Sequence, residues 1–286
     1  METKKDKGDP AHTSLSLNQV ALGDFRITAL SDGQFDIPAP FLVLGKVPLA
    51  ASPDPLPLDI NAFLVEGRGR KVLVDTGCGS KLGPTVNRTV SHLRAVGVDS
   101  SEVDTVLCTH IHPDHTNGLV DAAGGAVFPN AEIHVNRREL DYWLNESQMS
   151  RAPDPLKIQF AWAMQAFLPY RNQLQPFDDG HLAVGIEAVP LIGHTPGHTG
   201  FLIDGGGNQQ LLIWGDTVHA IDQQAANPDI SVIADVDQEL ARTTRRSLFD
   251  RVAVDKIRVA GMHLPFPGFG QLRQCGDGFA YDVNGG

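Results

Sequence analysis

The chain has 286 residues, of which 42% are hydrophobic, and 34 acidic residues against 23 lysines and arginines give it a net charge of −11 at pH 7. A chain of this length and apolar content can bury a large core. Its longest basic runs are the pairs Arg137-Arg138 and Arg245-Arg246. Because a protein that follows a nucleic-acid backbone carries a basic face, this composition argues against a nucleic-acid partner.

The first residues and the cysteines bear on the cellular context. The sequence has no run of 18 apolar residues, so we expect no membrane span. Residues 1–10 are charged and are not followed by the apolar segment of a secretory signal. A cytoplasmic location is therefore expected, or a periplasmic one if a signal was removed beforehand. Residues 1–18 are expected to form a flexible tail, and Cys78, Cys108 and Cys275 are too sparse for a disulfide framework.

The first predicted elements after this tail are strands. Residues 25–30 and 61–66 have the composition of strands. Between them lies a proline-rich stretch, residues 38–57, which we expect to be an irregular excursion near the mouth of the active site.

A strand at 71–74 leads into a helix that Pro84 opens and that runs to about Val96. Further strands are predicted at 103–108, 131–135, 182–189, 200–204, 211–215 and 257–261, and further helices at 136–146, 155–168 and 237–253. Strands in runs with interspersed helices fit a layered α/β architecture, in one domain over residues 19–286.

Four metal-capable side chains are packed into the sequence His-Ile-His-Pro-Asp-His, directly after a predicted buried strand. His110 and His112 are two residues apart, so in extended backbone they leave on the same face and can reach one ion. Pro113 turns the chain, so the side chains of Asp114 and His115 can point toward a second metal position. Two adjacent metal sites are the economical interpretation. Since a catalytic zinc has about three protein ligands and an open position for water, the rest of the chain must supply more ligands.

Three other places supply candidates. Residues 193–200, Gly-His-Thr-Pro-Gly-His-Thr-Gly, form a tight turn that carries His194 and His198. Asp216 follows the apolar segment Leu-Leu-Ile-Trp-Gly, and His263 follows Ile-Arg-Val-Ala-Gly-Met. The repeated order is an apolar strand followed by a ligand candidate, and the whole span must fold as one unit for these residues to meet.

With these motifs the chain resembles the dinuclear hydrolases of the metallo-β-lactamase fold. The matching motifs are His110-Ile111-His112-Pro113-Asp114-His115, Pro196-Gly197-His198, Gly215-Asp216 and His263, together with Leu73-Val74-Asp75-Thr76-Gly77. They occur in the family's order over roughly residues 72–263. The resemblance implies a four-layer αββα sandwich.

The resemblance also implies two divalent ions per chain. It places His110, His112 and His198 on one ion, Asp114, His115 and His263 on the other, and Asp216 between them. Imidazole and carboxylate donors without thiolate favour Zn²⁺, although Mn²⁺, Co²⁺ and Fe²⁺ fit the same donors.

Two residues near these ligands have competing interpretations. Asp75 would orient a ligand from behind, although an aspartate before Thr-Gly can instead cap a turn. His194 lies four residues before His198 and competes with it for the metal. The Pro-Gly-His match favours His198, so we assign His194 to a supporting or packing role.

A narrower resemblance is to the methyl parathion hydrolase branch, which includes phosphotriesterases and related lactonases. It rests on Leu22 to Gly33, Phe128-Pro129-Asn130-Ala131, Gly193 to Thr199 and His263 to Gly268. The implied reaction is attack by a metal-bridging hydroxide on phosphorus or on a carbonyl carbon. Asp114, which would move a proton, and Asp216 are the catalytic candidates.

This branch suggests phosphotriesters first, lactones or aryl esters second and β-lactams third as substrates, and a homodimer as the assembly. A non-catalytic metal-binding protein that kept the fold is the alternative from another class. Trp143, Phe160 and Leu82 are candidates for lining the substrate pocket. Trp143 also falls on the apolar face of a helix that Asn136 would cap with Glu139 three residues on, so core packing is the alternative for it.

Overall fold

The computed structural model describes residues 18–49, 54–183 and 185–283, whose strands form two large sheets and one small sheet. Nearly all of the expected tail, and residues 50–53 of the proline-rich stretch, lie outside the described residues. The first sheet has the order β1 (Gln19–Leu22), β2 (Phe25–Ile37), β5 (Leu56–Gly67), β6 (Arg70–Val74), β7 (Thr105–Leu107), β8 (Glu132–Asn136) and β9 (Leu174–Phe177). The second has the order β10 (Gly180–Ala183), β11 (Ile186–Pro190), β12 (Thr199–Asp204), β13 (Gln210–Ile213), β15 (Arg258–Ala260), β16 (Phe269–Cys275) and β17 (Gly278–Asp282).

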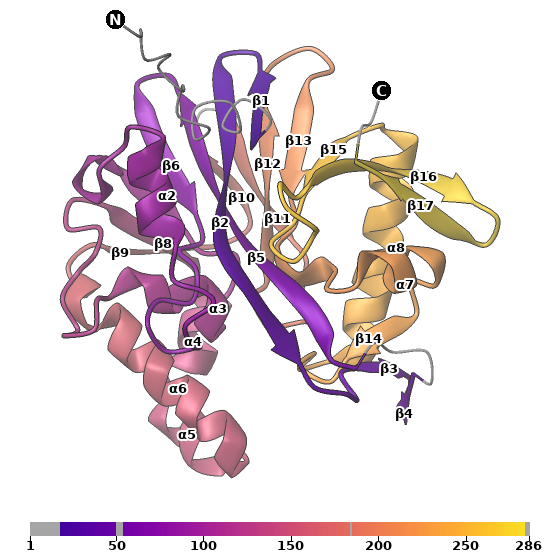
Figure 1. The fold of residues 1–286 in the computed structure, drawn as a ribbon, viewed down its shortest axis with the longest axis horizontal. Helices are drawn as coiled ribbons and strands as arrows, with labels where there is room; N and C mark the ends of the chain where they lie inside the picture. The colour runs from indigo at the N-terminus through magenta and orange to yellow at the C-terminus, as the bar shows by residue number, and fades with distance from the viewer. Residues whose placement is uncertain (1–17, 50–53, 184, 284–286) are drawn as a thin grey trace, which may run out of the picture.

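Helices cover the outer face of each large sheet (Figure 1). The first sheet carries α2 (Thr89–Ala95), α3 (Pro113–Thr116), α4 (Arg137–Trp143), α5 (Glu146–Arg151) and α6 (Asp154–Phe167). The second carries α7 (Ile221–Ala226) and α8 (Gln238–Val254). The predicted four-layer αββα sandwich is confirmed.

Alternating side chains of the strands fill the three interfaces between these layers. On β5, Leu64 packs in the cluster under α2, α4 and α6, whereas its neighbour Phe63 packs in the cluster between the two sheets. On β12, Phe201 faces the first sheet, and Leu202 packs with Phe249 of α8. Because successive side chains of a strand point to opposite faces, each central strand contributes to two interfaces.

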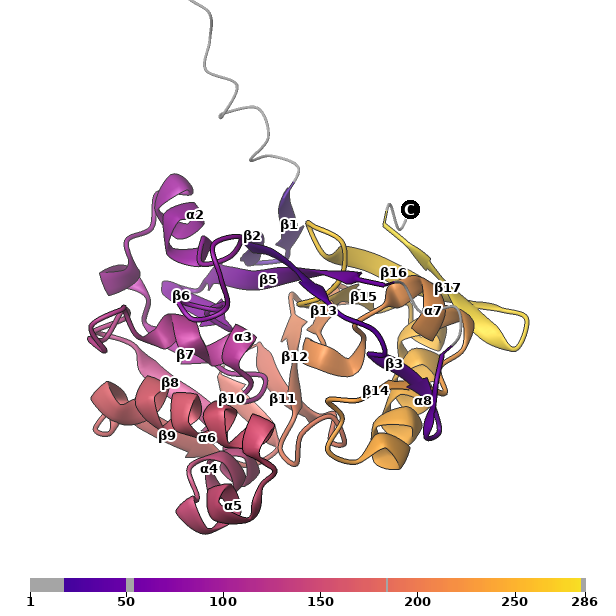
Figure 2. The same ribbon diagram turned by 60° about the horizontal axis from the view of Figure 1, so that its bottom comes forward.

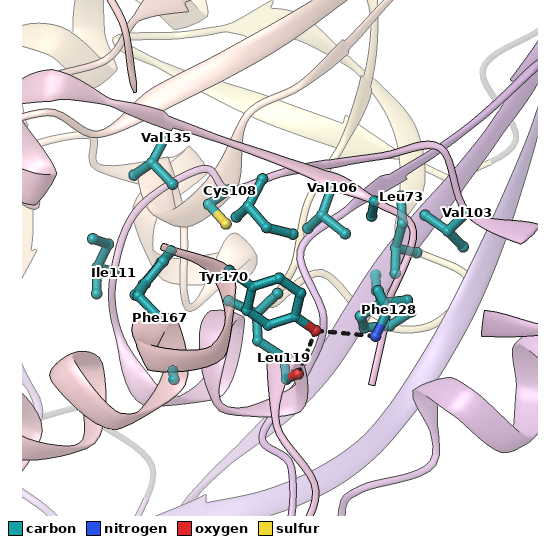
Figure 3. Packing of buried hydrophobic residues seen from close by; sticks show 14 of the residues in the cluster. Leu73, Val103, Val106, Cys108, Ile111, Leu119, Phe128, Val135, Phe167 and Tyr170 are labelled. Carbon is teal, nitrogen blue, oxygen red and sulfur yellow. Dashed lines mark hydrogen bonds between the residues drawn. The ribbon is translucent and has the colours of Figure 1, made fainter. Parts of the chain in front are cut away.

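A buried tyrosine ties a long loop to the helical layer on the first sheet (Figure 3). Tyr170 is fully buried, and its hydroxyl donates to the Leu119 carbonyl at 2.7 Å and accepts from the Phe128 amide at 3.0 Å. Both capacities of the hydroxyl are therefore used, as a buried polar group requires.

The helix predicted from Pro84 begins later than expected. The observed helix α2 starts at Thr89. Before it, Asn87 has a φ of 74°, which no helix interior adopts, and the Asp32 carboxylate accepts from the amides of Asn87, Arg88 and Thr89. The competing carboxylate from a distant strand holds residues 84–88 as a loop.

The other predicted helices are found, with one interruption. The segment 136–146 divides into α4, whose N-cap is Asn136 as predicted, and α5, whose N-cap is Asn145. The segments 155–168 and 237–253 correspond to α6 and α8. Among the described residues, none of the helices is both long and apolar enough to cross a bilayer.

The proline-rich stretch is more regular than predicted. β2 continues to Ile37 and β5 starts at Leu56, so the stretch connects the two strands of a long hairpin and contributes only its last two residues to β5. At its tip, β3 (Leu42–Leu44) pairs with β4 (Val47–Pro48) and with β14 (Ile230–Val232), which lies beside it in Figure 2. Apolar residues at this tip, Leu42 among them, pack with Ala220 and Val232. This small sheet fastens the hairpin to the half of the molecule that carries α7 and α8.

Truncating Phe201 to alanine removes a fully buried ring from between the two sheets. We expect the free energy of unfolding to fall by about 3–5 kcal/mol, the usual cost of a large cavity. Urea denaturation measures it. Val254→Ala, at a position 78% exposed at the end of α8, is the control, with a change of less than about 0.5 kcal/mol expected. Equal effects of the two changes would contradict the layer assignment.

Candidate metal centre and pocket

Ligand candidates from both large sheets meet at one edge of the sandwich. The strands β6 and β7 form a parallel pair in the first sheet, and β13 and β15 form one in the second. Asp75 follows β6, His110 comes soon after β7, Asp216 follows β13 and His263 follows β15. Because parallel strands open their carboxyl ends on the same side, donors far apart in the sequence converge there.

The loop after β7 divides its ligand candidates between two directions. His112 has extended backbone, with φ −97° and ψ 159°, and precedes α3, whose first residue is Pro113. Asp114 and His115 therefore leave from the first turn of a helix, while His110 and His112 leave from the extended segment before it. Proline at the first helical position is favoured because its missing N–H is not needed there.

The first group of donors contains His110, His112, His194 and Asp216, whose ligand atoms all lie within 4.8 Å of one another. Nδ1 of His112 lies 3.0 Å from Nε2 of His110 and 3.0 Å from Nε2 of His194. Oδ2 of Asp216 lies 3.3 Å from Nε2 of His194 and 3.6 Å from Nε2 of His110. All four residues are buried.

The second group contains Asp114, His115, Asp216 and His263, also within 4.8 Å. Nε2 of His115 lies 3.2 Å from Oδ1 of Asp216, and Nε2 of His263 lies 3.0 Å from Oδ2 of Asp216. Oδ2 of Asp114 is 3.4 Å from His115 and 3.5 Å from His263. Asp216 belongs to both groups, in the shared position expected from the sequence.

His198 does not fit the ligand role expected for it, and His194 stands in its place. The Nδ1 of His198 donates to the Leu191 carbonyl at 2.8 Å, and its Nε2 accepts from the Asp216 amide at 2.8 Å. Both ring nitrogens are therefore used by backbone. A signal in the sequence favoured His194, because it follows the strand β11, as the other candidates follow theirs, whereas His198 precedes β12.

Three of the histidines are held from behind through Nδ1. The Nδ1 of His115 lies 2.7 Å from Asp75 Oδ2, that of His194 lies 2.8 Å from Asp235 Oδ1, and that of His263 lies 2.9 Å from the carbonyl of residue 59. These acceptors assign the ring proton to Nδ1. In the neutral ring, which is the form that binds a metal, each Nε2 then presents a lone pair to the centre. Sequence reasoning missed Asp235, which belongs to no motif.

The inward-facing atoms fit divalent cations. Within the described part of the chain, His115 Nε2 and Asp216 Oδ1 are buried and have no hydrogen-bond partner. An imidazole lone pair and a carboxylate oxygen 3.2 Å apart repel each other unless a proton or a metal cation lies between them. The donors are nitrogen and oxygen without thiolate, a set that suits zinc and other first-row ions.

Electrostatics within the groups keep the carboxylates ionised. Burial raises the pKa of Asp216, but the facing His115, His263 and His110 outweigh burial and hold it well below its usual value. Burial opposes protonation of His194, yet its hydrogen bonds to Asp216 and Asp235 raise its pKa to about 9. The cluster thus attracts positive charge.

A buried carboxylate joins the two loops that carry the histidines. Glu139 is fully buried; its Oε2 accepts from the Ile111 amide at 2.8 Å and its Oε1 from the Gly197 amide at 2.7 Å. The sequence suggested that Glu139 supports the N-cap of its own helix. The structure uses it instead to hold loops that lie 28 and 58 residues away.

A pocket of about 700 Å³ opens over the two groups. Its walls are mainly apolar and include Phe35, Ile37, Phe41, Leu82, Trp143 and Val236. Phe160, which we expected in the pocket, lies behind Trp143, with ring centroids 4.8 Å apart, and is buried in the core under the helices. Among the described lining residues there is no lysine or arginine.

His219 is a further pocket residue, which belongs to none of the motifs found in the sequence. It is only 5% exposed, and its Nε2 lies 3.1 Å from Asp216 Oδ2. Its ring stacks on His263, with centroids 4.9 Å apart, and meets Phe41 edge-on. Its position three residues after Asp216, on the turn that leaves β13, was the available signal.

Known proteins share this sequence pattern and fold. An acyl-coenzyme A thioesterase from Bos taurus is 29% identical over 174 residues, which are 56% of this chain, and the match spans only 58% of that protein. The crystal structure of the hydrolase AbOPH, described as in the beta lactamase superfamily, superposes with a TM-score of 0.83 and 29% identity, covering 92% of this chain and 96% of the other. AidC, a dizinc quorum-quenching lactonase in complex with a product, has a TM-score of 0.83 and 24% identity over 92% and 95% of the two chains.

The family comparison covers the span that carries the donors. The family model of the metallo-beta-lactamase superfamily matches residues 55–263, from the strand β5 to His263. This is well over half of the chain, and both structural neighbours have the same architecture. The chain belongs to the metallo-beta-lactamase superfamily.

Proposed function

We propose that this protein is a dinuclear metal-dependent hydrolase of neutral esters, with lactones and phosphotriesters as its substrate classes and zinc as the expected metal. The observation that carries the proposal is the pair of donor groups that share Asp216 at the base of an apolar pocket. Divalent ions bound there would lower the pKa of water and withdraw charge from the oxygen of the scissile bond. The dizinc lactonase with the same fold supports zinc.

In this proposal the ligands follow the two groups seen in the structure. The donors of one ion are His110, His112, His194 and Asp216, and those of the other are Asp114, His115, His263 and Asp216. Asp75 and Asp235 hold the outer nitrogens of His115 and His194, which fixes ring orientation and strengthens the donors.

Asp114 is the proposed group that moves a proton. Its carboxylate is 14% exposed, against 2% for Asp216, and it lines the pocket. Burial raises its pKa, but His115 and His263 outweigh burial and lower it, so it remains ionised and able to accept a proton from the attacking water.

The pocket favours uncharged substrates. The described lining residues offer aromatic and aliphatic surface and the acidic side chains Asp114, Asp216 and Asp235, but no lysine or arginine. A phosphate monoester, a β-lactam carboxylate or the phosphates of coenzyme A would find no counter-charge outside the metals. Lactones and phosphotriesters are uncharged and bring apolar substituents that such walls can bury. The homodimer stays a prediction for light scattering to test.

A substrate panel tests the charge preference. With zinc-loaded protein we expect kcat/KM for methyl paraoxon or for a δ-lactone to exceed that for 4-nitrophenyl phosphate and for nitrocefin by roughly tenfold or more. The ratio between the two neutral substrates identifies the main activity. A higher kcat/KM for either anionic substrate than for the neutral ones would contradict the neutral-ester proposal.

The ligand assignment is tested by comparing His194 with His198. We expect His194→Ala to retain fewer zinc ions than the wild type, which binds about two, because the first group then keeps only His110, His112 and the shared Asp216 as donors and holds its metal more weakly. His198→Gln keeps an acceptor for the Asp216 amide and should retain about two. Metal analysis after dialysis measures both, and the reverse pattern would restore His198 as the ligand.

A further inference from the structure

We infer that Arg245 is a positioning residue for the metal centre, because it fixes both the Asp216 turn and the carboxylate that holds His194. Arg245 lies on α8, outside every motif, and is 1% exposed. The inference rests on the proposed metal centre and adds to it a residue that touches neither metal nor substrate.

The guanidinium is buried among backbone carbonyls. Its Nε donates to the Thr217 carbonyl at 2.7 Å, and its Nη1 donates to the carbonyls of Pro228 at 2.9 Å and Ile230 at 2.7 Å. Its Nη2 lies 3.9 Å from Asp235 Oδ2, an ion-pair distance. Burial lowers its pKa to about 10, so it remains charged at neutral pH. A cation is buried at such cost only where several acceptors compensate it.

These contacts connect two donors of the first metal group. Thr217 directly follows Asp216, so the bond from Arg245 fixes the turn that presents the shared carboxylate. Asp235 accepts from His194 Nδ1 through Oδ1 and from the Val232 amide through Oδ2. Arg245 thus holds Asp216 through the backbone of Thr217, and it holds His194 through Asp235.

Asp75, the carboxylate that holds His115, pairs with no lysine or arginine among the described residues. Asp75 follows the strand β6 directly and accepts from both the amide and the hydroxyl of Thr109, after the neighbouring strand β7. Asp235 instead lies in the turn after the three-residue strand β14, outside both large sheets. Arg245 on α8 therefore holds Asp235 in place, as Thr109 after the neighbouring strand holds Asp75.

Zinc affinity separates this role from a purely structural one. For Arg245→Met we expect the affinity for the ion of the His194 group to fall about 10–100-fold, the usual effect of losing an outer support. The other ion should weaken by less than about threefold, because only Asp216 is shared. Chelator competition on the full-length protein measures both affinities, and His194→Ala identifies which ion is which. Unfolding of the metal-free protein is followed separately.

Two further variants and one control complete the test. Asp235→Asn should show the same selective loss of zinc affinity. The double variant Arg245→Met/Asp235→Asn should bind this ion no more weakly than the weaker of the two single variants, because both side chains act on His194 through the same contact. Arg246→Met, the next residue on α8, removes an exposed pair with Asp229 and should leave both affinities unchanged. If Arg245→Met does not fold, Arg245→Lys, which keeps the charge, and Asp235→Asn decide the question.

The outcomes distinguish this inference from the proposed centre. Lower stability with both zinc affinities unchanged, or equal weakening of both ions, overturns the role of Arg245. Wild-type protein that binds no zinc contradicts the metal centre itself.

Discussion

The centre depends on one electrostatic constraint: the lone pairs of buried imidazoles and the charges of two carboxylates are directed at the same small volume. Around Oδ2 of Asp216, four histidine Nε2 atoms lie within 3.6 Å: those of His110, His194, His219 and His263. Such an arrangement is stable only when positive charge occupies it, whether as protons or as metal. The raised pKa of His194 and the lowered pKa of Asp216 are two expressions of that demand.

In the sandwich, the elements that carry the ligand candidates differ from the side chains that hold those candidates in place. Parallel strand pairs, one in each sheet, present donors at a common edge. Side chains behind them provide the support. Asp75, directly after a strand of the first sheet, and Asp235, in a turn outside the large sheets, each hold a histidine ring, whereas Glu139 holds the backbone of two loops. Directional hydrogen bonds to the outer nitrogens matter because a rotated imidazole no longer aims its lone pair at the metal.

The pocket above the centre draws on segments from both halves of the chain. Phe41 comes from the hairpin extension, Trp143 from α4, and Val236 from the turn after β14. Pairing of β3 with β14 brings the first and last of these together. The result is an apolar pocket whose polar lining consists mainly of acidic side chains and of histidines that face the metal centre. This is the physical basis for expecting a neutral electrophile rather than an anionic one.

The sequence alone determined the family, the layered fold and most of the donors, because those rest on local patterns: an apolar strand, then a histidine or aspartate. Only the tertiary structure decided between His194 and His198, since that choice depends on which ring nitrogens are already bonded to the Leu191 carbonyl and the Asp216 amide. The roles of Glu139 and Asp235 were equally invisible. Their partners lie 28 to 58 residues away, and no local pattern encodes a contact that exists only when separate loops pack together.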